Sequence, residues 1–479
     1  MTEGFDAHMS DADALMWNIE KDPLLRSTIV TVLVFDRAPD FHALRDRIAA
    51  GAMMIPRMRE RVATPMFRVG PPYWSEDPHF DIDYHLRRVR APAPATFDSV
   101  LDIARCSAMS GFDRARPLWE YTLVEGLHDG RAAFVMKVHH SMTDGVGGMR
   151  LLIMLFDLER NPIEPTFEAV VVGSRRLDQA QLIRRSLDHR RRRAMGIVRR
   201  GLADSVAVTR ALRADPVGTV RDGIRTARSI ARYLAPATVP ESPIMRSRTL
   251  ARRLGSIELP LDDLKRAAKA VGCSLNDAFV SAVTGGLRRY HAHHGALPRE
   301  LRMTMPISLR DDAASLGGNH FTPARFLVPI AITDPAERTR ETSRRCREMR
   351  DEPAVQLTDA LAGVLNQLPT ALTTSLFGSI LKGADFVTSN VPGAAFPLFM
   401  AGAELERMWA FAPLSGTSVN VTLVSHNGTC CIGVNTDAVA VPDTETFLKC
   451  LQAGFDEVVA LGESRRADET PAGLGQPAE

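Results

Sequence analysis

Apolar and polar positions along the first third of the chain follow two periods, one of a strand and one of a helix. The β-branched run from Thr28 to Phe35 is typical of a buried strand, and Ser10 followed by Asp13 is typical of a helix N-terminus. Further strands are predicted at 118–124 and 132–138, and further helices at 41–50, 97–110 and 147–158. Strands that alternate with helices indicate an α/β unit, which we assign to residues 1–165.

A second α/β unit is predicted at residues 245–462, after prolines at 236, 240 and 243. Strands are expected to end near 259 and to cover 301–307, 321–330, 386–390 and 404–412, with a hairpin over 419–434. Helices are expected at 261–271, 274–291, from 335 onward, and at 443–461. The tail, 463–479, is rich in Pro, Gly and acidic residues, and we predict that it is disordered.

The two units share a sequence fragment. Thr122-Leu123-Val124 leads through His128-Asp129-Gly130 into a strand ending at His139, and Thr422-Leu423-Val424 leads through His426-Asn427-Gly428 into one ending near Asn435. Asp-Gly and Asn-Gly favour hairpin turns, so each fragment predicts a hairpin. Nine residues after the turn glycine stand His139 in one unit and Asp437 in the other. Two related halves explain the match, and so does chance similarity between two hairpins.

The segment that joins the units, 166–244, is strongly basic. Between Arg175 and Arg232 there are sixteen Arg and five Asp, a local excess of +11 in a chain whose formal net charge is +2. The spacing of its apolar residues predicts two or three amphipathic helices. The segment could be a solvated crossover, a contact with an anionic membrane surface, or a nucleic-acid contact. The last is disfavoured because Tyr233 is the only aromatic residue from Arg175 to Tyr233 that could stack on bases.

Composition narrows the class of protein further. With 479 residues, 45% of them hydrophobic and 24% charged, the chain is typical of a soluble globular protein with ample core. Its six cysteines fit neither the spacing of a zinc site nor a disulfide scaffold, which favours a reducing compartment. No signal peptide and no membrane span are expected, because no long apolar run occurs.

Candidate chemistry lies where the strand at 132–138 ends. His139-His140-Ser141-Met142-Thr143-Asp144-Gly145 follows the strand directly, and strand ends in α/β folds are where catalytic groups commonly lie. Side chains alternate along a strand, so His139 and His140 are expected to face opposite ways. A metal site is disfavoured, because adjacent histidines cannot easily converge on one ion.

This segment resembles the HHxxxDG signature of the acyltransferase superfamily that includes chloramphenicol acetyltransferase and peptide-synthetase condensation domains. One branch, the bacterial wax ester synthase/acyl-CoA:diacylglycerol acyltransferase family, is similar over about 11–461. The supporting segments are Ser10 to Ala14, Trp74 with Phe80 to His85, Arg116 to Glu120, Asn276-Asp277, Met305 to Arg310, Gly318-Asn319, Ser389 to Gly393 and Ala401 to Ala403. The resemblance implies two chloramphenicol-acetyltransferase-like α/β sandwich halves, joined here by the basic helical linker.

It also implies a reaction, the transfer of a fatty acyl group from acyl-CoA to a lipid hydroxyl, either diacylglycerol or a long-chain alcohol. By resemblance His140 is the general base, and no acyl-enzyme forms. His139 is either packed structurally or a second base. Asp144 either orients the imidazole or forms a buried ion pair with Arg310, which relatives use in this way.

Other residues have both a substrate-binding and a plain structural interpretation. Gly145, Gly147 and Gly148 could let backbone N–H groups approach the oxyanion, or could form only a turn into the helix. Asn276 could hold a substrate carbonyl or hydroxyl, whereas the neighbouring Asp277 is explained by capping with Ser274. Ser389 and Asn390 either line a channel or end a strand in a turn. Ser141-Met142 departs mildly from the family pattern and bears on the choice of acceptor.

We therefore expect an enzyme with acyl-CoA as co-substrate, no cofactor and no metal, in which His140 lies near the middle of a channel between the halves. Transfer from a carrier-protein thioester and a catalytically silent lipid-binding protein are the alternatives. Because its products are insoluble, the protein is expected to be cytoplasmic, with peripheral attachment to an anionic membrane surface or to lipid bodies.

Overall fold

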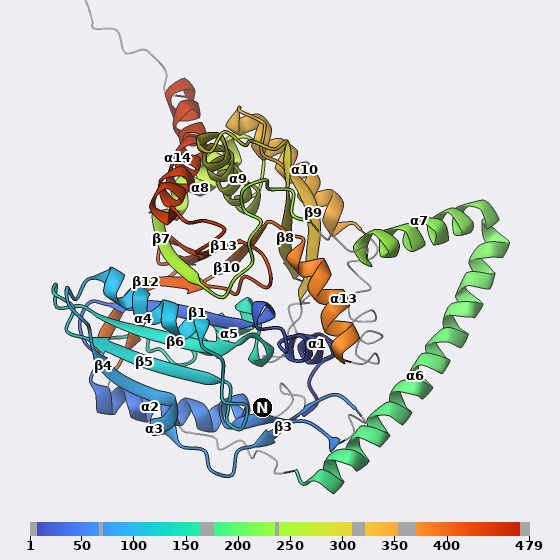
Figure 1. Cartoon of the computed structure of the whole chain (residues 1–479), viewed down its shortest axis with the longest axis horizontal. Helices are drawn as coiled ribbons and strands as arrows, with labels where there is room; N and C mark the ends of the chain where they lie inside the picture. Colours follow the sequence, from blue (N-terminus) through green and yellow to red (C-terminus); the bar gives the residue numbers. More distant parts are fainter. Residues whose placement is uncertain are drawn as a thin grey trace, which may run out of the picture.

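Two six-stranded sheets, each with helices packed on it, lie one above the other (Figure 1). The computed structural model describes residues 7–66, 70–162, 177–234, 239–308, 321–352 and 370–469. The predicted α/β class with two sheet-containing halves is confirmed.

The first sheet has the strand order β11-β12-β1-β6-β5-β4. Its strands are β1 (Thr28–Phe35), β4 (Leu86–Arg90), β5 (Trp119–Glu125), β6 (Ala132–His139), β11 (Phe399–Met400) and β12 (Ala403–Phe411). The helices of this half are α1 (Asp11–Ile19), α2 (Phe41–Met54), α3 (Ile82–His85), α4 (Phe97–Met109) and α5 (Gly145–Ile153), with short 3₁₀ turns η1 (Pro23–Leu25), η2 (Pro56–Met58) and η4 (His140–Met142). A separate two-stranded ribbon pairs β2 (Glu60–Ala63) with β3 (Tyr73–Glu76).

The second sheet has the order β7-β14-β13-β10-β8-β9. Its strands are β7 (Arg252–Pro260), β8 (Glu300–Ser308), β9 (Phe321–Pro329), β10 (Phe386–Pro392), β13 (Val419–His426) and β14 (Thr429–Asp437). Its helices are α8 (Leu261–Ala270), α9 (Leu275–His293), α10 (Pro335–Arg350), α13 (Thr370–Lys382) and α14 (Thr444–Glu469).

Strand β12 crosses from the second half into the first sheet. It pairs antiparallel with β1, with Val30 opposite Phe411 and Val32 opposite Trp409. Sheet membership therefore does not follow the order of the chain alone. This pairing brings the ends of β10 and β13 close to the edge of the first sheet, where the two halves meet.

Four strands in each half repeat the same arrangement. In the first half β1 pairs antiparallel with β6, β6 antiparallel with β5, and β5 parallel with β4. In the second half β7, β14, β13 and β10 pair in the same order with the same directions. Both fragments of similar sequence are hairpins, β5–β6 and β13–β14. Shared topology supports the interpretation of two related halves over chance similarity.

Alternation along β1 divides the core of the first half into two layers. Leu33 and Phe35 face α2 and α5, whereas Val30, Val32 and Val34 face α4 and the neighbouring strands β12 and β14. Apolar side chains of α8, α9 and α14 form a separate core on one face of the second sheet. The other face of that sheet is turned toward the first half.

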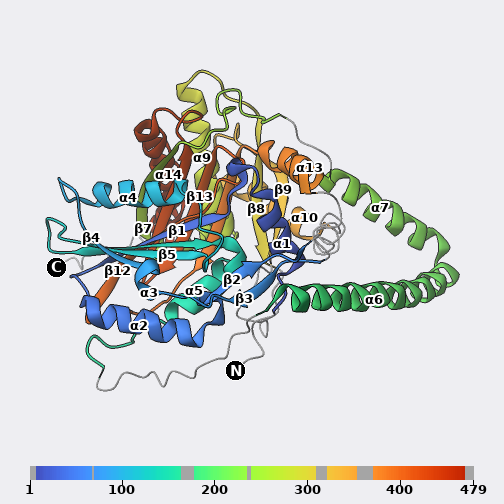
Figure 2. The ribbon, with the colours of Figure 1, turned by 60° about the horizontal axis from the view of Figure 1, so that its bottom comes forward.

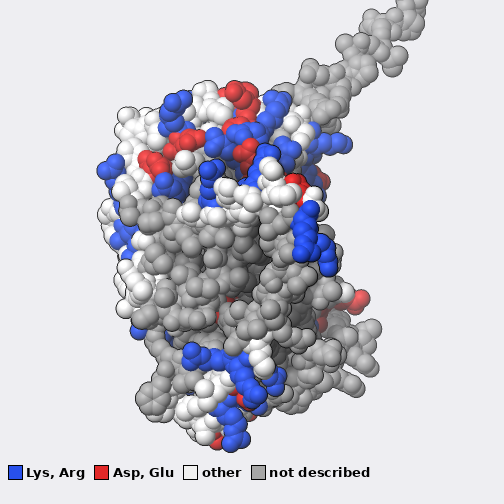
Figure 3. Space-filling model, turned by 90° about the vertical axis from the view of Figure 1, so that its right-hand side faces the viewer, with Lys and Arg blue, Asp and Glu red and all other residues white. Residues whose placement is uncertain are grey.

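The basic linker forms two helices, α6 (Gln179–Ala214) and α7 (Pro216–Leu234), which extend away from both sheets as an arm (Figures 1 and 2). The prediction of helices in this segment is confirmed. Figure 3 views the molecule from the side on which the arm extends and shows basic side chains on that face. Among the described residues, no helix combines the length and apolar character needed to cross a membrane.

Some predictions about elements were incomplete. Helix α14 continues to Glu469, so the predicted disorder is wrong for 463–469, and 470–479 lie outside the described residues. Helix α5 begins at Gly145 and ends at Ile153, earlier than expected at both ends. Strand β4 and helix α13 were not predicted. For β4 the reason is that it is an edge strand whose side chains are mostly exposed, so it lacks the apolar pattern of a buried strand.

The junction of the sheets depends on a close approach at Gly433 of β14. A Cβ atom there would lie 2.2 Å from the carbonyl oxygen of Ala410 in β12. Gly433→Ala should therefore lower the free energy of unfolding by about 1–3 kcal/mol, the usual range for overpacking. Gly223→Ala on α7 is the matched control, because a Cβ atom there meets nothing within 4 Å. Equal melting temperatures for the two variants would contradict this prediction.

Candidate active site

The two histidines lie at the turn between β6 and α5. β6 ends at His139, His140 to Met142 form the turn η4, and Asp144 is the N-cap residue of α5. We call residues 139–144 the histidine turn. The expectation that this segment follows a strand end and precedes a helix is confirmed. His139 ends the strand and His140 begins the turn, and the two lie in different surroundings.

The His139 ring is buried, and both of its nitrogens are engaged. Nδ1 accepts the backbone N–H of Ser141 at 3.1 Å and lies 2.7 Å from the Ser141 Oγ. A backbone N–H can only donate, so Nδ1 carries no proton. The ring proton is therefore on Nε2, which donates to Glu20 Oε1 at 2.8 Å. This arrangement fits the interpretation of His139 as a structurally bound residue and not as a second base.

Glu20 is mostly buried beside His139. Burial disfavours its ionised form, but the contacts with His139, the backbone N–H of Ser27 and the charge of Arg114 together hold the pKa of Glu20 below its ordinary value of 4.5. The lowered pKa means that ionised Glu20 stabilises the fold above pH 4.5. This contribution is lost as the pH falls through the folded-state pKa.

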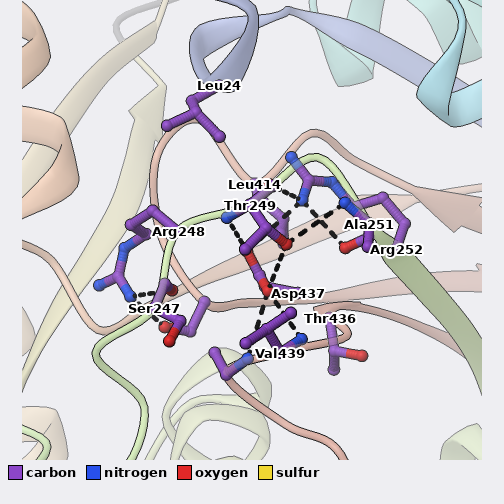
Figure 4. A network of polar contacts seen from close by, with 12 residues as sticks. Leu24, Ser247, Arg248, Thr249, Ala251, Arg252, Leu414, Thr436, Asp437 and Val439 are labelled. Carbon is purple, nitrogen blue, oxygen red and sulfur yellow. Dashed lines mark hydrogen bonds and ion pairs between the residues drawn. The ribbon is translucent and has the colours of Figure 1, made fainter.

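In the second half, the end of β14 corresponds to the end of β6 and has Asp437 in the place of His139 (Figure 4). His139 N–H bonds to Leu118 O at 3.0 Å, and Asp437 N–H bonds to Ser418 O at 2.8 Å. The side-chain contacts also correspond. Asp437 Oδ1 accepts the backbone N–H of Val439, two residues later, at 2.9 Å, as His139 Nδ1 accepts the backbone N–H of Ser141. His139 and Asp437 thus fill the same structural position. The neighbour of Asp437 is Ala438, which has no group for proton transfer.

His140 lines a cavity of about 240 Å³ that lies between the halves. Its backbone N–H donates to Ser27 O at 2.8 Å. The walls come from α1 and the chain that leads into β1, from the histidine turn and the start of α5, from β8, β9, β10 and β13, from α13, and from the end of β12 with the segment after it. The residues with polar side chains in this lining are Ser27, His140, Asp144, Thr304, Ser389, Asn390, Ser415, Asn420 and Thr422. We call this the junction cavity.

A second cavity, of about 130 Å³, lies within the first half between the sheet, α5 and η2. It shares wall residues with the junction cavity, namely Ile29, Asp144, Gly145, Val391 and Ala410. Its lining is largely apolar, with five methionines at 58, 136, 142, 149 and 408. We call it the methionine cavity. The two cavities adjoin at these shared wall residues, and His140 lines the junction cavity but not the methionine cavity, so a channel with His140 near its middle stays a prediction.

Asp144 and the glycines after it build the start of α5. Asp144 Oδ1 accepts the backbone N–H of Gly147 at 2.8 Å, which supports the interpretation of Asp144 as a residue that shapes the loop. Its expected partner Arg310 lies outside the described residues. Gly145 lines both cavities, and a Cβ atom there would lie 2.8 Å from Val391 Cγ2. Gly148 lines the methionine cavity, whereas Gly147 serves the cap.

The structure brings some of the other expected residues to the site and leaves one away from it. Ser389 and Asn390 line the junction cavity, as expected. Asn276 does not, because its amide lies 3.5 Å from Met305 Sδ. Met305 belongs to the core beneath α9, and its neighbours Thr304 and Pro306 line the cavity from the opposite face of β8. The second sheet thus separates Asn276 from the junction cavity, and its contact with substrate stays a prediction that this placement does not support.

Asp277 has the predicted capping role. It forms a reciprocal capping box with Ser274 at the start of α9 and also accepts a hydrogen bond from Ser343 at 2.9 Å. Ser141 likewise is bonded to His139 and does not point into a cavity, so its departure from the family pattern affects the turn. Met142 lines the methionine cavity.

Two residues that the sequence analysis did not identify, Glu20 and Ser27, bind the histidine turn. No motif marks them, and their partners His139 and His140 lie more than a hundred residues away in sequence. In the described part of the chain, His293, His294 and Asp443 are close enough to share a metal ion. They lie where α9 ends and α14 begins, not in either cavity.

The cap of α5 gives a test of Asp144. Asp144→Ala should lower the free energy of unfolding by about 1–2 kcal/mol, because the Gly147 N–H loses its acceptor. Asp144→Asn keeps an acceptor oxygen, so its difference from the wild type measures what the charge contributes. Asp40→Ala, at the exposed N-cap of α2, is the matched control for urea unfolding. An Asp144→Ala variant as stable as the wild type would contradict the capping role.

Comparisons with known proteins agree with this geometry. The profile of the wax ester synthase/diacylglycerol acyltransferase catalytic domain matches residues 9–279, and that of the family's C-terminal domain matches 317–458. A Mycobacterium tuberculosis protein provisionally named a diacylglycerol O-acyltransferase is 38% identical over 453 residues, which are 95% of this chain and 92% of that protein. Another from the same organism, with the same provisional name, is 28% identical over 97% of this chain and 98% of its own length.

Solved structures show the same fold. The wax ester synthase/diacylglycerol acyltransferase from Marinobacter aquaeolei VT8 aligns with a TM-score of 0.61 and 20% identity, over 95% of this chain and all of that one. The first condensation domain of the calcium-dependent antibiotic synthetase, bound to a substrate analogue, aligns with a TM-score of 0.58 and 16% identity, over 95% and 96% of the two chains. The sequence matches show that the chain belongs to the wax ester synthase/diacylglycerol acyltransferase family and is an acyltransferase.

Proposed function

We propose that the protein transfers a fatty acyl group from acyl-CoA to the hydroxyl group of a lipid, either diacylglycerol or a long-chain alcohol. The observation that carries this proposal is the place of His140, which lines the junction cavity while both ring nitrogens of His139 are engaged elsewhere. The names of the family and of the M. tuberculosis relatives supply the acceptor class.

In the proposed reaction, a neutral His140 imidazole removes the proton of the acceptor hydroxyl as its oxygen attacks the thioester carbonyl carbon. A tetrahedral intermediate forms, and its oxyanion can be stabilised by backbone N–H groups near Gly145 and Val146, which line the cavity at the start of α5. The C–S bond then breaks, and His140 returns the proton to the CoA thiolate. The ester and free CoA leave, and no covalent enzyme intermediate is needed.

The methionine cavity suits the acyl chain. Ala410, Thr31, Met136 and Tyr121 stand opposite one another in a single row across β12, β1, β6 and β5, and all four line it. Three strand spacings give this row a length of about 14 Å. Its end at Ala410 adjoins the junction cavity, so an acyl chain lying along the row would leave its thioester near His140.

We further propose that the arm attaches the enzyme to the cytoplasmic face of an anionic membrane or to lipid bodies. On α7 the apolar side chains of Val217, Val220 and Ile224 are 78%, 53% and 48% exposed and follow helical spacing. Arg221, Arg225 and Arg228 are exposed beside them. An apolar stripe next to arginines is typical of a helix that lies in a lipid interface.

The assignment of the base is tested with purified protein, labelled palmitoyl-CoA and a panel of diacylglycerol and alcohol acceptors, whose products are separated by thin-layer chromatography. His140→Ala should lower turnover by about 10²- to 10⁴-fold, the usual contribution of a general base, with the fold intact. His139→Ala should act mainly through stability, because its ring is buried in the turn.

A folded His139→Ala variant that lost more turnover than His140→Ala would reverse this assignment. Palmitoyl groups on an acyl carrier protein are assayed in parallel, and a clear preference for that donor would replace acyl-CoA. A wild-type protein without turnover on any donor and acceptor would favour a lipid-binding role.

Sedimentation with lipid vesicles tests the arm. We expect binding to anionic but not neutral vesicles and release by salt on the order of 0.5 M, because salt screens the arginines. Changing the exposed Arg190, Arg191 and Arg192 of α6, together with Arg221, Arg225 and Arg228 of α7, to Gln should abolish binding. Arg193, Arg199 and Arg200 also contribute to the basic excess of the linker and are candidates for the same change, but their side chains lie outside the described residues.

Changing Val217, Val220 and Ile224 to Ser should weaken binding to anionic vesicles at low salt, because the apolar stripe of α7 would no longer enter the lipid interface. The control replaces Arg340, Arg347 and Arg350 of α10, which are exposed on the second half, with Gln. Equal binding to neutral vesicles, or an equal loss in the α10 control, would show that the arginines of the arm do not direct attachment.

A further inference from the structure

Glu20 takes no part in the proposed chemistry, yet it binds His139 in the histidine turn and Ser27, whose carbonyl oxygen is bonded to His140. It follows the last residue of α1, and its side chain is 10% exposed. One carboxylate oxygen, Oε1, accepts the His139 Nε2–H at 2.8 Å and the backbone N–H of Ser27 at 2.6 Å. The other oxygen lies 3.6 Å from Arg114 Nη2, and Arg114 in turn lies over the Trp17 ring of α1.

These contacts reach His140 by two routes. Along the chain, His139 is its direct neighbour, and Glu20 fixes the orientation of that ring. Across the sheet, the carbonyl oxygen of Ser27 accepts the backbone N–H of His140 at 2.8 Å. The backbone N–H of Ser27 in turn donates to Glu20. A single oxygen atom therefore restrains the backbone of His140 from both directions.

The second half supports the interpretation that such a restraint belongs to this corner of the fold. There, Ala438 N–H bonds to Ala251 O at 3.0 Å, as His140 bonds to Ser27. The side chain of Asp437 is held by Thr249, whose hydroxyl donates to Oδ1 at 2.9 Å and whose backbone N–H donates to Oδ2 (Figure 4). In both halves, a residue before the first strand binds the side chain at the end of the last strand of the four-strand unit. Glu20 precedes β1 and binds His139 at the end of β6, and Thr249 precedes β7 and binds Asp437 at the end of β14.

We propose that Glu20 is a positioning residue for acyl transfer, which holds the His140 imidazole against the junction cavity through its hydrogen bonds to His139 and Ser27. The inference rests on the proposed function, since it concerns the placement of the proposed base. What matters is the acceptor oxygen, so a residue that keeps this oxygen without the charge should keep the position.

Steady-state kinetics of Glu20→Ala and Glu20→Gln test the inference. Glu20→Ala should lower kcat about 10- to 100-fold, because small misplacements of a reacting group are costly, while the KM for palmitoyl-CoA stays within about twofold. Glu20→Gln keeps the amide oxygen for both donors and should restore kcat to within about fivefold of the wild type.

Asp36→Ala is the matched control. Asp36 follows the opposite end of β1, accepts the Glu404 backbone N–H at 2.7 Å and pairs with Arg160 at 2.9 Å, much as Glu20 pairs with Ser27 and Arg114. Its loss should lower the melting temperature and leave kcat unchanged. If Glu20→Ala behaves like Asp36→Ala, or if Glu20→Gln loses as much kcat as Glu20→Ala, the inference is overturned.

Hydrogen exchange of the peptide that covers the histidine turn gives a readout that does not need turnover. The amides of His140 and Ser141 are bonded to Ser27 O and His139 Nδ1, so they should exchange at least tenfold faster in Glu20→Ala and at the wild-type rate in Asp36→Ala. Unchanged exchange in Glu20→Ala would overturn the positioning role. A wild-type protein without acyl transfer, in contrast, would refute the proposed function whatever the exchange result.

Discussion

The antiparallel pairing of β12 with β1 is the interaction on which the site depends. It takes a strand from late in the chain and places it beside β1 in the first sheet, with Thr31 opposite Ala410. Ala410 then lines both cavities, and the chain that follows it supplies part of the junction cavity. The pairing therefore supplies part of the wall that the two cavities share.

The two halves use one structural corner for two purposes. In each, the last strand of a four-strand unit ends in a buried side chain that accepts a nearby N–H, from Ser141 to His139 and from Val439 to Asp437. The first half adds an imidazole at the next position, where the second has Ala438. The corresponding turns thus differ in the residue at this second position, while the first residue, His139 or Asp437, has the same structural role in both.

Much of this could be predicted from the sequence, and the failures have physical reasons. The limits of β1 were predicted correctly, because a β-branched run leaves little choice of conformation. A pattern does not tell which strand a segment will pair with, so the place of β12 was missed. The placement of Asn276 away from the junction cavity was not predicted, because only the alternation of side chains along β8 decides that Met305 and Thr304 face opposite sides. Glu20 was missed because its partner, His139, is 119 residues away.

The arm of α6 and α7 connects the halves by a path outside both of them (Figure 2). The strand pairing and the packed cores, and not this connection, set how the halves meet. Because the entropic cost of closing a connection grows only slowly with its length, the arm can lengthen, shorten or change composition with little effect on the cavities. In evolutionary terms the length and composition of the arm can change independently of the residues that line the two cavities.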